Sequence, residues 1–192
     1  PGAAGWQAAV DLPWIPQWGV RLAVGVDGIA LTLVLLTTLL MPLAVLGSWT
    51  SIRTKPHSYY ALLMLLTVGM LGVFVALDLV LFYVMWEVML VPMYLIIGVW
   101  GGERRLYAAI KFFIYTMIGS LLMLVAILYL GAEASRVLGS PTFSYDFILN
   151  NVRLDPTATL WLFGAFALAF AVKVPMFPFH TWLPDAHVEA PT

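Results

Sequence analysis

The sequence predicts an all-α membrane protein, a polytopic bundle of about five transmembrane helices. Of its 192 residues, 62% are hydrophobic and only 10% are charged, whereas a soluble domain carries roughly 25% charged residues. So few charges cannot cover a soluble protein, and we therefore expect the lipid bilayer to be the main solvent. The apolar stretches are long and do not alternate with polar residues, as the strands of a membrane β-barrel would.

Five apolar stretches are long enough to cross a bilayer, which takes a helix of about 20 residues. The run 57–102 contains only Asp78 and Glu87 as charges and is too long for one helix, so we divide it by a tight hairpin at Asp78. Pro92, five residues after Glu87, is expected to kink its helix. The predicted spans are 28–52, 59–77, 79–100, 111–132 and 157–177.

The fifth span is expected to break near Pro175 and Pro178, because proline removes a backbone donor and disrupts a helix. Residues 178–192 then begin a broken-helix or loop region, and 1–192 is expected to form a single membrane domain. With neither an initiator Met nor a signal peptide, and with its end inside a polar motif, the chain is expected to be a fragment of a longer protein.

Basic residues predict the orientation of the spans. Arg53 and Lys55 lie in one loop, and Arg105 lies in another loop two spans later. By the positive-inside rule, both loops should face the cytoplasm. The hairpin at Asp78 and the segment 131–155, expected to be the only sizeable loop, should face the opposite side.

The composition also limits the chemistry. The chain has no cysteine, which excludes disulfides and thiolate-ligated clusters, and a net charge of −1 gives no reason to expect nucleic acid as a partner. It shows no Gly-rich phosphate loop, no nucleophile beside a base, and no haem or iron–sulfur ligand set. We therefore expect no cofactor-binding site and no metal site in this chain.

Glu87 is an ionisable residue inside a predicted span. An ionised side chain at the bilayer centre costs roughly 2.5–3.5 kcal/mol, so such residues are functional candidates. Its neighbours one helical turn away include Tyr83 and Leu90 but no charge, so a partner must come from another helix. We interpret Glu87 as a proton-accepting carboxylate. The alternative is a carboxyl group that stays protonated, or paired, for packing alone.

Lys173 is the second charge inside a predicted span. It follows a row of alanines, which permit close helix approach: Ala165, Ala167, Ala169 and Ala171. A nearby carboxylate favours the charged form of a buried lysine, so moving that carboxylate would change how firmly the lysine holds its proton. The alternative is a lysine that snorkels to the cytoplasmic interface. A straight helix would place Lys173 nearer that side than Glu87, and spacing alone does not show that the two touch.

Three further residues are possible proton relays, each with a simpler alternative. Asp78 at the hairpin tip is also interpreted as a solvated turn residue, and Lys111 at the start of a span as an interfacial residue. His180 follows the proline break and could pass protons, since its unperturbed pKa is about 6.5.

Tryptophans near span ends suit the membrane interface, and small residues suit helix packing. Gly69 and Gly72 are therefore interpreted as packing residues. The tryptophans interpreted as interface anchors are Trp6, Trp14, Trp18, Trp49, Trp100 and Trp182.

The segments around these charges resemble a known family. FHTWLPDAHVEAPT at 179–192, preceded by AFAVKVPMFP, is similar to the signature of the antiporter-like subunits of respiratory complex I. The resemblance covers nearly the whole chain. The segments that resemble in particular subunit M of NADH:quinone oxidoreductase, the counterpart of mitochondrial subunit 4, are FYVMWEVMLVPMYLIIGVWGG at 82–102, KFFIYTMIGSLLMLVAI at 111–127 and DLPWIPQWGVRLAVGVDGIAL at 11–31.

By analogy with the family fold, the resemblance implies a bundle of roughly fourteen helices, of which this chain holds about five. It implies that Glu87 corresponds to the family's glutamate on the fifth helix and Lys173 to the lysine on the broken seventh helix. These are proposed in the family to form an ion pair that modulates the lysine during proton translocation. His180 would lie in the break, and the family's central lysine and a later ionisable residue lie beyond this chain.

The resemblance also implies the surroundings of the protein. It implies an energy-coupling membrane, either the bacterial plasma membrane or an organelle membrane, with lipid, protons and other membrane-arm subunits of complex I as partners. NADH, FMN, iron–sulfur clusters and quinone would be bound by other subunits, so the chain would belong to an enzyme without holding a redox site itself.

Three functions remain open at this point. The first is a proton-translocating membrane-arm subunit of NADH:quinone oxidoreductase. The second is a subunit of a multi-subunit cation/proton antiporter, because the antiporter-like core around 173–192 is shared between the two. The third is a structural subunit that spans the membrane without pumping.

Overall fold

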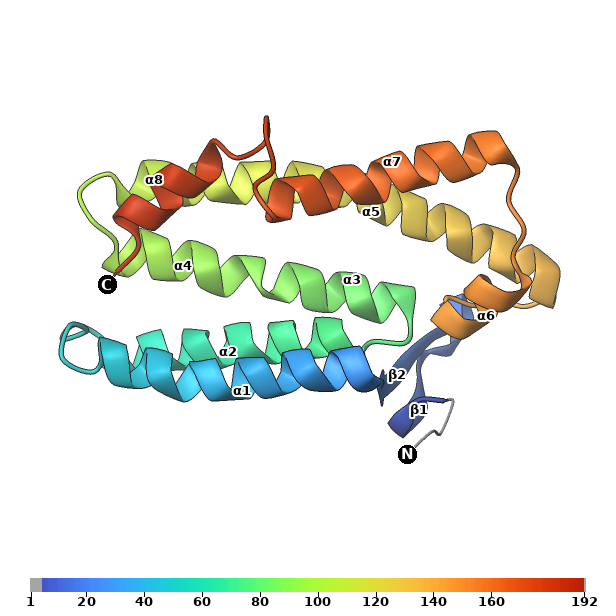
Figure 1. The fold of residues 1–192 in the computed structure, drawn as a ribbon, viewed down its shortest axis with the longest axis horizontal. Coiled ribbons are helices and arrows are strands. Elements are labelled where there is room, and N and C mark those ends of the chain that lie inside the picture. The colour runs from blue at the N-terminus through green and yellow to red at the C-terminus, as the bar shows by residue number, and fades with distance from the viewer. Residues whose placement is uncertain (1–4, 192) are drawn as a thin grey trace.

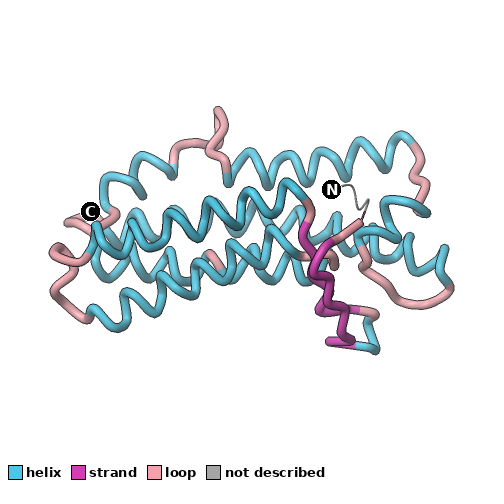
Figure 2. Tube along the Cα trace, turned by 60° about the horizontal axis from the view of Figure 1, so that its bottom comes forward, coloured by secondary structure: helices cyan, strands magenta, loops and turns pink. Residues whose placement is uncertain are grey.

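The computed structural model describes residues 5–191, so residues 1–4 and 192 of the expected domain 1–192 lie outside the described part. It is an elongated bundle of helices that lie side by side, with a two-stranded sheet at one end (Figures 1 and 2). Five helical segments of the described chain are long and apolar enough to cross a membrane. The predicted transmembrane helix bundle is confirmed.

The bounds of the helices differ from the predicted spans mainly at their ends. The helix of the fourth predicted span, 111–132, extends beyond these bounds on both sides. The helix of the fifth predicted span ends at Lys173 rather than at 177. The helices are α1 (Gly28–Ser48), α2 (Pro56–Val75), α3 (Leu79–Val88), α4 (Leu90–Trp100), α5 (Arg105–Leu138), α6 (Tyr145–Asn151), α7 (Pro156–Lys173) and α8 (Trp182–Glu189).

The bounds of α5 and α6, and the junction of α3 with α4, each bear on an expectation from the sequence. The segment 131–155 is not a single loop, because α5 continues to Leu138 and α6 occupies its middle. The helix is interrupted at Met89, since α3 ends at Val88 and α4 begins at Leu90, three residues before the proline at which the sequence predicted a kink. Proline has no N–H to donate to the carbonyl four residues earlier, which is that of Val88.

A β-hairpin precedes the helices, in a chain that the sequence predicted to be all-α. Strand β1 (Gln7–Ile15) pairs antiparallel with β2 (Val20–Val26), with Leu12 opposite Leu22. Figure 2 shows the strands projecting sideways from the bundle. The β2 sequence VRLAVGV is rich in valine, which favours strands, and a segment of this length is too short to span the bilayer as a helix.

The long helix α5 packs against α4, α7 and α8. A Cβ placed on Gly119 would lie 3.2 Å from Cβ of Val172 in α7, so the two backbones approach closely. Ala169 of the alanine row is buried, as expected for close helix packing. The buried small residues of α5 are Ala108, Ala109, Gly119, Ser120, Ala126, Gly131 and Ala134.

Gly69 and Gly72 of α2 are packing residues, as the sequence predicted. A Cβ on Gly69 would lie 2.6 Å from Cγ of Met89, and one on Gly72 would lie 2.5 Å from Cγ of Met85. The methionines of α3 and of its junction with α4 therefore occupy the space that these glycines leave open.

Apart from the connection between α7 and α8, the loops gather at two opposite ends of the bundle (Figure 1). At one end, Trp100 Nε1 donates to the Thr54 carbonyl at 2.6 Å, and the Arg104 N–H donates to Glu189 at 2.9 Å. The hairpin, Asp78 and α6 lie at the other end. This alternation agrees with the topology inferred from the basic loops, and which end faces the cytoplasm stays a prediction.

Replacing Gly19 by alanine should loosen the hairpin from the bundle. Gly19 has φ +68°, and a Cβ there would clash with the backbone carbonyl of Pro141. The left-handed conformation costs a non-glycine residue roughly 1–2 kcal/mol, and the clash adds about 1–3 kcal/mol. We expect a lower melting temperature of the purified full-length protein in detergent.

Gly139→Ala is the matched control for that substitution. Gly139 has φ +79°, but a Cβ there meets no atom within 4 Å. It should therefore show the conformational cost alone, and equal losses in the two variants would contradict the contact between Gly19 and Pro141.

Candidate functional site

Helices α3 and α7 bring Lys173 beside the two residues Trp86 and Glu87. The Lys173 Nζ lies over the Trp86 indole, 5.2 Å from the ring centre. Trp86 is eight residues after Asp78, which places it roughly 12 Å along the helix from the outer hairpin. Helix α7 begins beyond the outer end of α3 and stops at mid-bundle (Figure 1), so the number of residues from the start of α7 does not by itself place Lys173 deeper than Glu87, and their relative depth stays a prediction.

Glu87 has a buried carboxylate oxygen, Oε1, that accepts no hydrogen bond from the described residues. Within 5–191, the ion pairs closer than 4.0 Å do not include one between Glu87 and Lys173. Glu87 is nevertheless the next residue after Trp86, over whose ring the Lys173 ammonium lies. The structure therefore brings the two predicted site residues near each other without direct contact.

Helix α7 ends at Lys173, and the non-helical segment 174–181 that follows, here called the break, leads to α8. Trp182 Nε1 donates to the Val172 carbonyl at 2.9 Å, so a backbone group at the helix end keeps a partner, as the membrane interior requires. The interpretation of Trp182 as an interface anchor is wrong, because the residue is buried and packs against Phe112. His180 lies in this break, and its buried Nδ1 has no hydrogen-bond partner among residues 5–191.

Lys111 pairs with Asp185 of α8 through a contact of 2.6 Å between Nζ and Oδ2. Both side chains are partly buried. Helix α5 starts at Arg105, so Lys111 lies within the helix rather than at its start, and its position at the membrane interface stays a prediction. Tyr115 lies one turn after Lys111 on α5, and its hydroxyl oxygen accepts a hydrogen bond from the Thr181 hydroxyl at 2.8 Å. Two polar side chains of α5 thus contact α8 and the end of the break.

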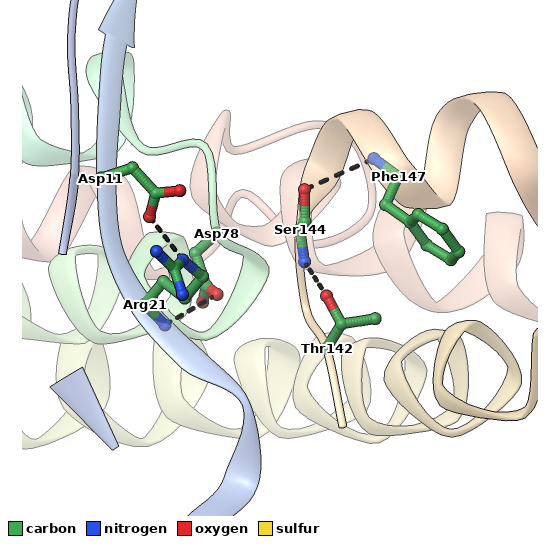
Figure 3. Close-up of polar contacts among 6 residues, drawn as sticks. All are labelled: Asp11, Arg21, Asp78, Thr142, Ser144 and Phe147. Carbon is green, nitrogen blue, oxygen red and sulfur yellow. Dashed lines mark hydrogen bonds and ion pairs between the residues drawn. The ribbon is translucent and has the colours of Figure 1, made fainter. Parts of the chain in front are cut away.

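Asp78 is a buried helix cap, which corrects its interpretation as a solvated turn residue. Its side chain is 1% exposed and accepts from the backbone N–H groups of Val80, Leu81 and Arg21 at 2.9–3.1 Å. Figure 3 shows both contacts of Arg21: its backbone N–H donates to Asp78, and its guanidinium forms an ion pair with Asp11. Burial raises the pKa of Asp78, and the three donors oppose that shift.

Backbone hydrogen bonds join three distant segments around Asp78. Leu77 N–H donates to Ala23 of β2 at 2.8 Å, and Tyr145 N–H donates to the Leu77 carbonyl at 2.9 Å. Ser144 caps α6 beside this junction by accepting from Phe147 (Figure 3). We call this junction of 23–24, 76–79 and 143–145 the outer clamp. It holds Asp78 at the bundle end, away from Glu87.

Comparison with known proteins decides the family. Residues 76–192, more than half of the chain, match the family described as NADH:quinone oxidoreductase/Mrp antiporter, transmembrane region. The chain belongs to this family. It is therefore a multi-pass membrane protein. The matched part of this antiporter-family chain contains both Glu87 and Lys173.

The chain spans less than two fifths of the length of the relatives described next. The chain is 45% identical over 196 aligned residues to subunit M of the NADH-quinone oxidoreductase of Escherichia coli K12. This alignment covers all of the chain but only 38% of that relative. The fold of the chain is similar to a chain of respiratory complex I from Thermus thermophilus with bound NADH, at 39% identity and TM-score 0.80 over 95% of this chain and 37% of that one. It is also similar to a chain of the Mrp complex of Dietzia sp. DQ12-45-1b, at 26% identity and TM-score 0.80 over 98% and 20%.

Trp86 is the site residue that sequence reasoning missed. Its position in the sequence could have indicated a role. Trp86 lies in the middle of a predicted span rather than at an end, and it directly precedes the intramembrane Glu87. Its contact with Lys173 crosses between helices far apart in the chain, so only the fold reveals it.

Asp78→Asn should remove a pH-dependent part of the protein's stability. Burial raises the pKa of Asp78 in the folded protein. The stabilising contribution is thus complete below the unfolded pKa, about 3.9, and is lost as the pH rises through the raised value. Wild-type protein should gain more in melting temperature than Asp78→Asn protein when the pH is lowered from about 7 to about 4.

The measurement is the melting temperature of the full-length protein in detergent at a series of pH values. Asp155→Asn is the control, because Asp155 caps α7 in the same way but is exposed. Removing this exposed carboxylate should change the pH slope less than Asp78→Asn does. A slope for Asp78→Asn identical to the wild-type slope would contradict the role of Asp78.

Proposed function

We propose that the chain is part of a membrane-arm subunit of an NADH:quinone oxidoreductase that translocates protons. The proposal rests on one observation: the Lys173 ammonium of α7 lies over Trp86 of α3, whose neighbour Glu87 has a buried carboxylate oxygen without a hydrogen-bond partner among residues 5–191. Charges in that environment are costly, and packing alone gives no reason for two of opposite sign. The identity to subunit M of E. coli supports the assignment to this complex.

The pair would act as a switch for the lysine proton. Coulomb attraction is strong where water is excluded, so Glu87 close to Lys173 would hold the ammonium charged. Separating the two groups would release the proton to a carrier further along. Quinone reduction elsewhere in the complex would supply the energy for that separation.

Two further residues are proposed as relays towards this pair. Lys111 with Asp185 lies on the α8 side of the break, and His180 lies in the break with a free buried nitrogen on the described chain. Histidine changes charge near neutral pH and can pass a proton between its two nitrogens. Asp78 is instead proposed to act in the outer clamp, because its carboxylate already accepts three backbone bonds.

The redox groups are proposed to be bound by other subunits. The chain has no cysteine, the usual ligand of iron–sulfur clusters, so it offers no donor set of that kind. NADH, FMN, clusters and quinone would therefore lie in partner subunits, with this chain held among the other membrane-arm subunits and lipid.

A second candidate function is a subunit of a multi-subunit cation/proton antiporter. The likeness to the Mrp complex of Dietzia favours it, because the backbone matches with the same TM-score as complex I. The lower identity, 26% against 39%, makes it the weaker candidate. A gene neighbourhood with NADH- and quinone-binding subunits would support the oxidoreductase, and a cluster without them would support the antiporter.

Glu87→Gln and Lys173→Ala should each reduce proton pumping at least about tenfold, since a positioned proton-transfer group contributes more than that. Pumping and coupled quinone reduction would be measured in membrane vesicles that contain the full-length protein, with assembly checked by native electrophoresis. Lys55→Ala, in an exposed loop, should leave both unchanged. Full pumping by both site variants would overturn the proposed switch and leave the third candidate, a structural subunit.

A further inference from the structure

Lys173 has a contact that the proposed switch does not use. Its ammonium lies over the face of Trp86 at 5.2 Å from the ring centre, within the roughly 6 Å at which a cation is attracted to an aromatic face. The indole provides the strongest such attraction among aromatic side chains. Trp86 is 9% exposed, so little water competes for the ammonium at this face.

The Trp86 ring is held in place from two sides. Phe170 of α7 meets it edge to face at 5.5 Å and 74°, and Phe82 of α3 lies 5.8 Å from it. Phe170 and Lys173 are three residues apart, which puts them on the same face of α7. The helix that presents the ammonium therefore also fixes the ring that receives it.

Trp86 and Glu87 are consecutive residues of α3, so they project from the helix roughly 100° apart. Lys173 is thus within reach of two stabilising groups with different directions: an aromatic face and a carboxylate. In the structure the ammonium lies on the first, while Glu87 Oε1 has no hydrogen-bond partner in 5–191.

We infer that Trp86 is a positioning residue that receives the Lys173 ammonium as it separates from Glu87, before the lysine passes its proton on. This inference rests on the proposed switch. Separation of an ion pair in the membrane leaves a bare ammonium, which is costly without a partner. The Trp86 face gives that ammonium a second position inside the protein, and so lowers the barrier to each opening of the pair.

The test changes the electrostatics of the ring without changing its shape. Tryptophan with zero, one, two or three ring fluorines is incorporated at position 86 alone in the full-length protein, and proton pumping is measured in vesicles with the assembled complex. Fluorine withdraws charge from the ring face, so the pumping rate should fall stepwise with fluorine number, reaching about a tenfold loss. Trp86→Phe should retain more pumping than Trp86→Leu, because only phenylalanine keeps an aromatic face.

Trp161 is the matched control, because it lies on the same helix as Lys173 but is 75% exposed. The same fluorine series at Trp161 should leave pumping unchanged. Equal pumping across the Trp86 series, together with lost pumping in Lys173→Ala, would overturn the role of Trp86 and leave the proposed function standing. Undiminished pumping in Lys173→Ala would overturn the proposed function as well. If Trp86→Leu fails to assemble, the fluorine series still decides, since it preserves packing.

Discussion

The small-residue face of α5 is the constraint on which the rest of the structure depends. Because Gly119 has no side chain, Val172 of α7 packs directly against the α5 backbone. Lys173 is the next residue, so this approach is what brings its ammonium over Trp86 of α3. A bulkier residue at 119 would displace Lys173 although no charge had been altered, since interhelical distance in lipid is set by the size of the residues in contact.

The interruption after Lys173 is stabilised by the same helix. In lipid each backbone group needs a partner within the protein, and Trp182 provides one for the carbonyl of Val172. Trp182 in turn packs on Phe112 of α5, and Asp185 of the following helix pairs with Lys111 of α5. Both ends of the break are therefore attached to α5, which keeps Lys173 at a fixed depth.

The spans were predictable because length and hydropathy alone define them, as were the packing roles of Gly69 and Gly72. The hairpin was not, since VRLAVGV reads as a short apolar run next to the first span. Glu87 and Lys173 were identified from their charge, whereas their relation to Trp86 depends on contacts between separate helices. The burial of Asp78 was equally hidden, because one of its donors, Arg21, is 57 positions away.

The outer clamp imposes an order on membrane insertion. Leu77 precedes α3, whereas Tyr145 follows α5, and the bond between them closes a loop that contains α3, α4 and α5. That bond cannot form until all three helices have been threaded through the bilayer and residue 145 has been delivered to the far side. Until then the β-hairpin is joined only to residues 76–78 of the clamp. The finished clamp therefore marks a nascent chain whose first four spans are correctly placed.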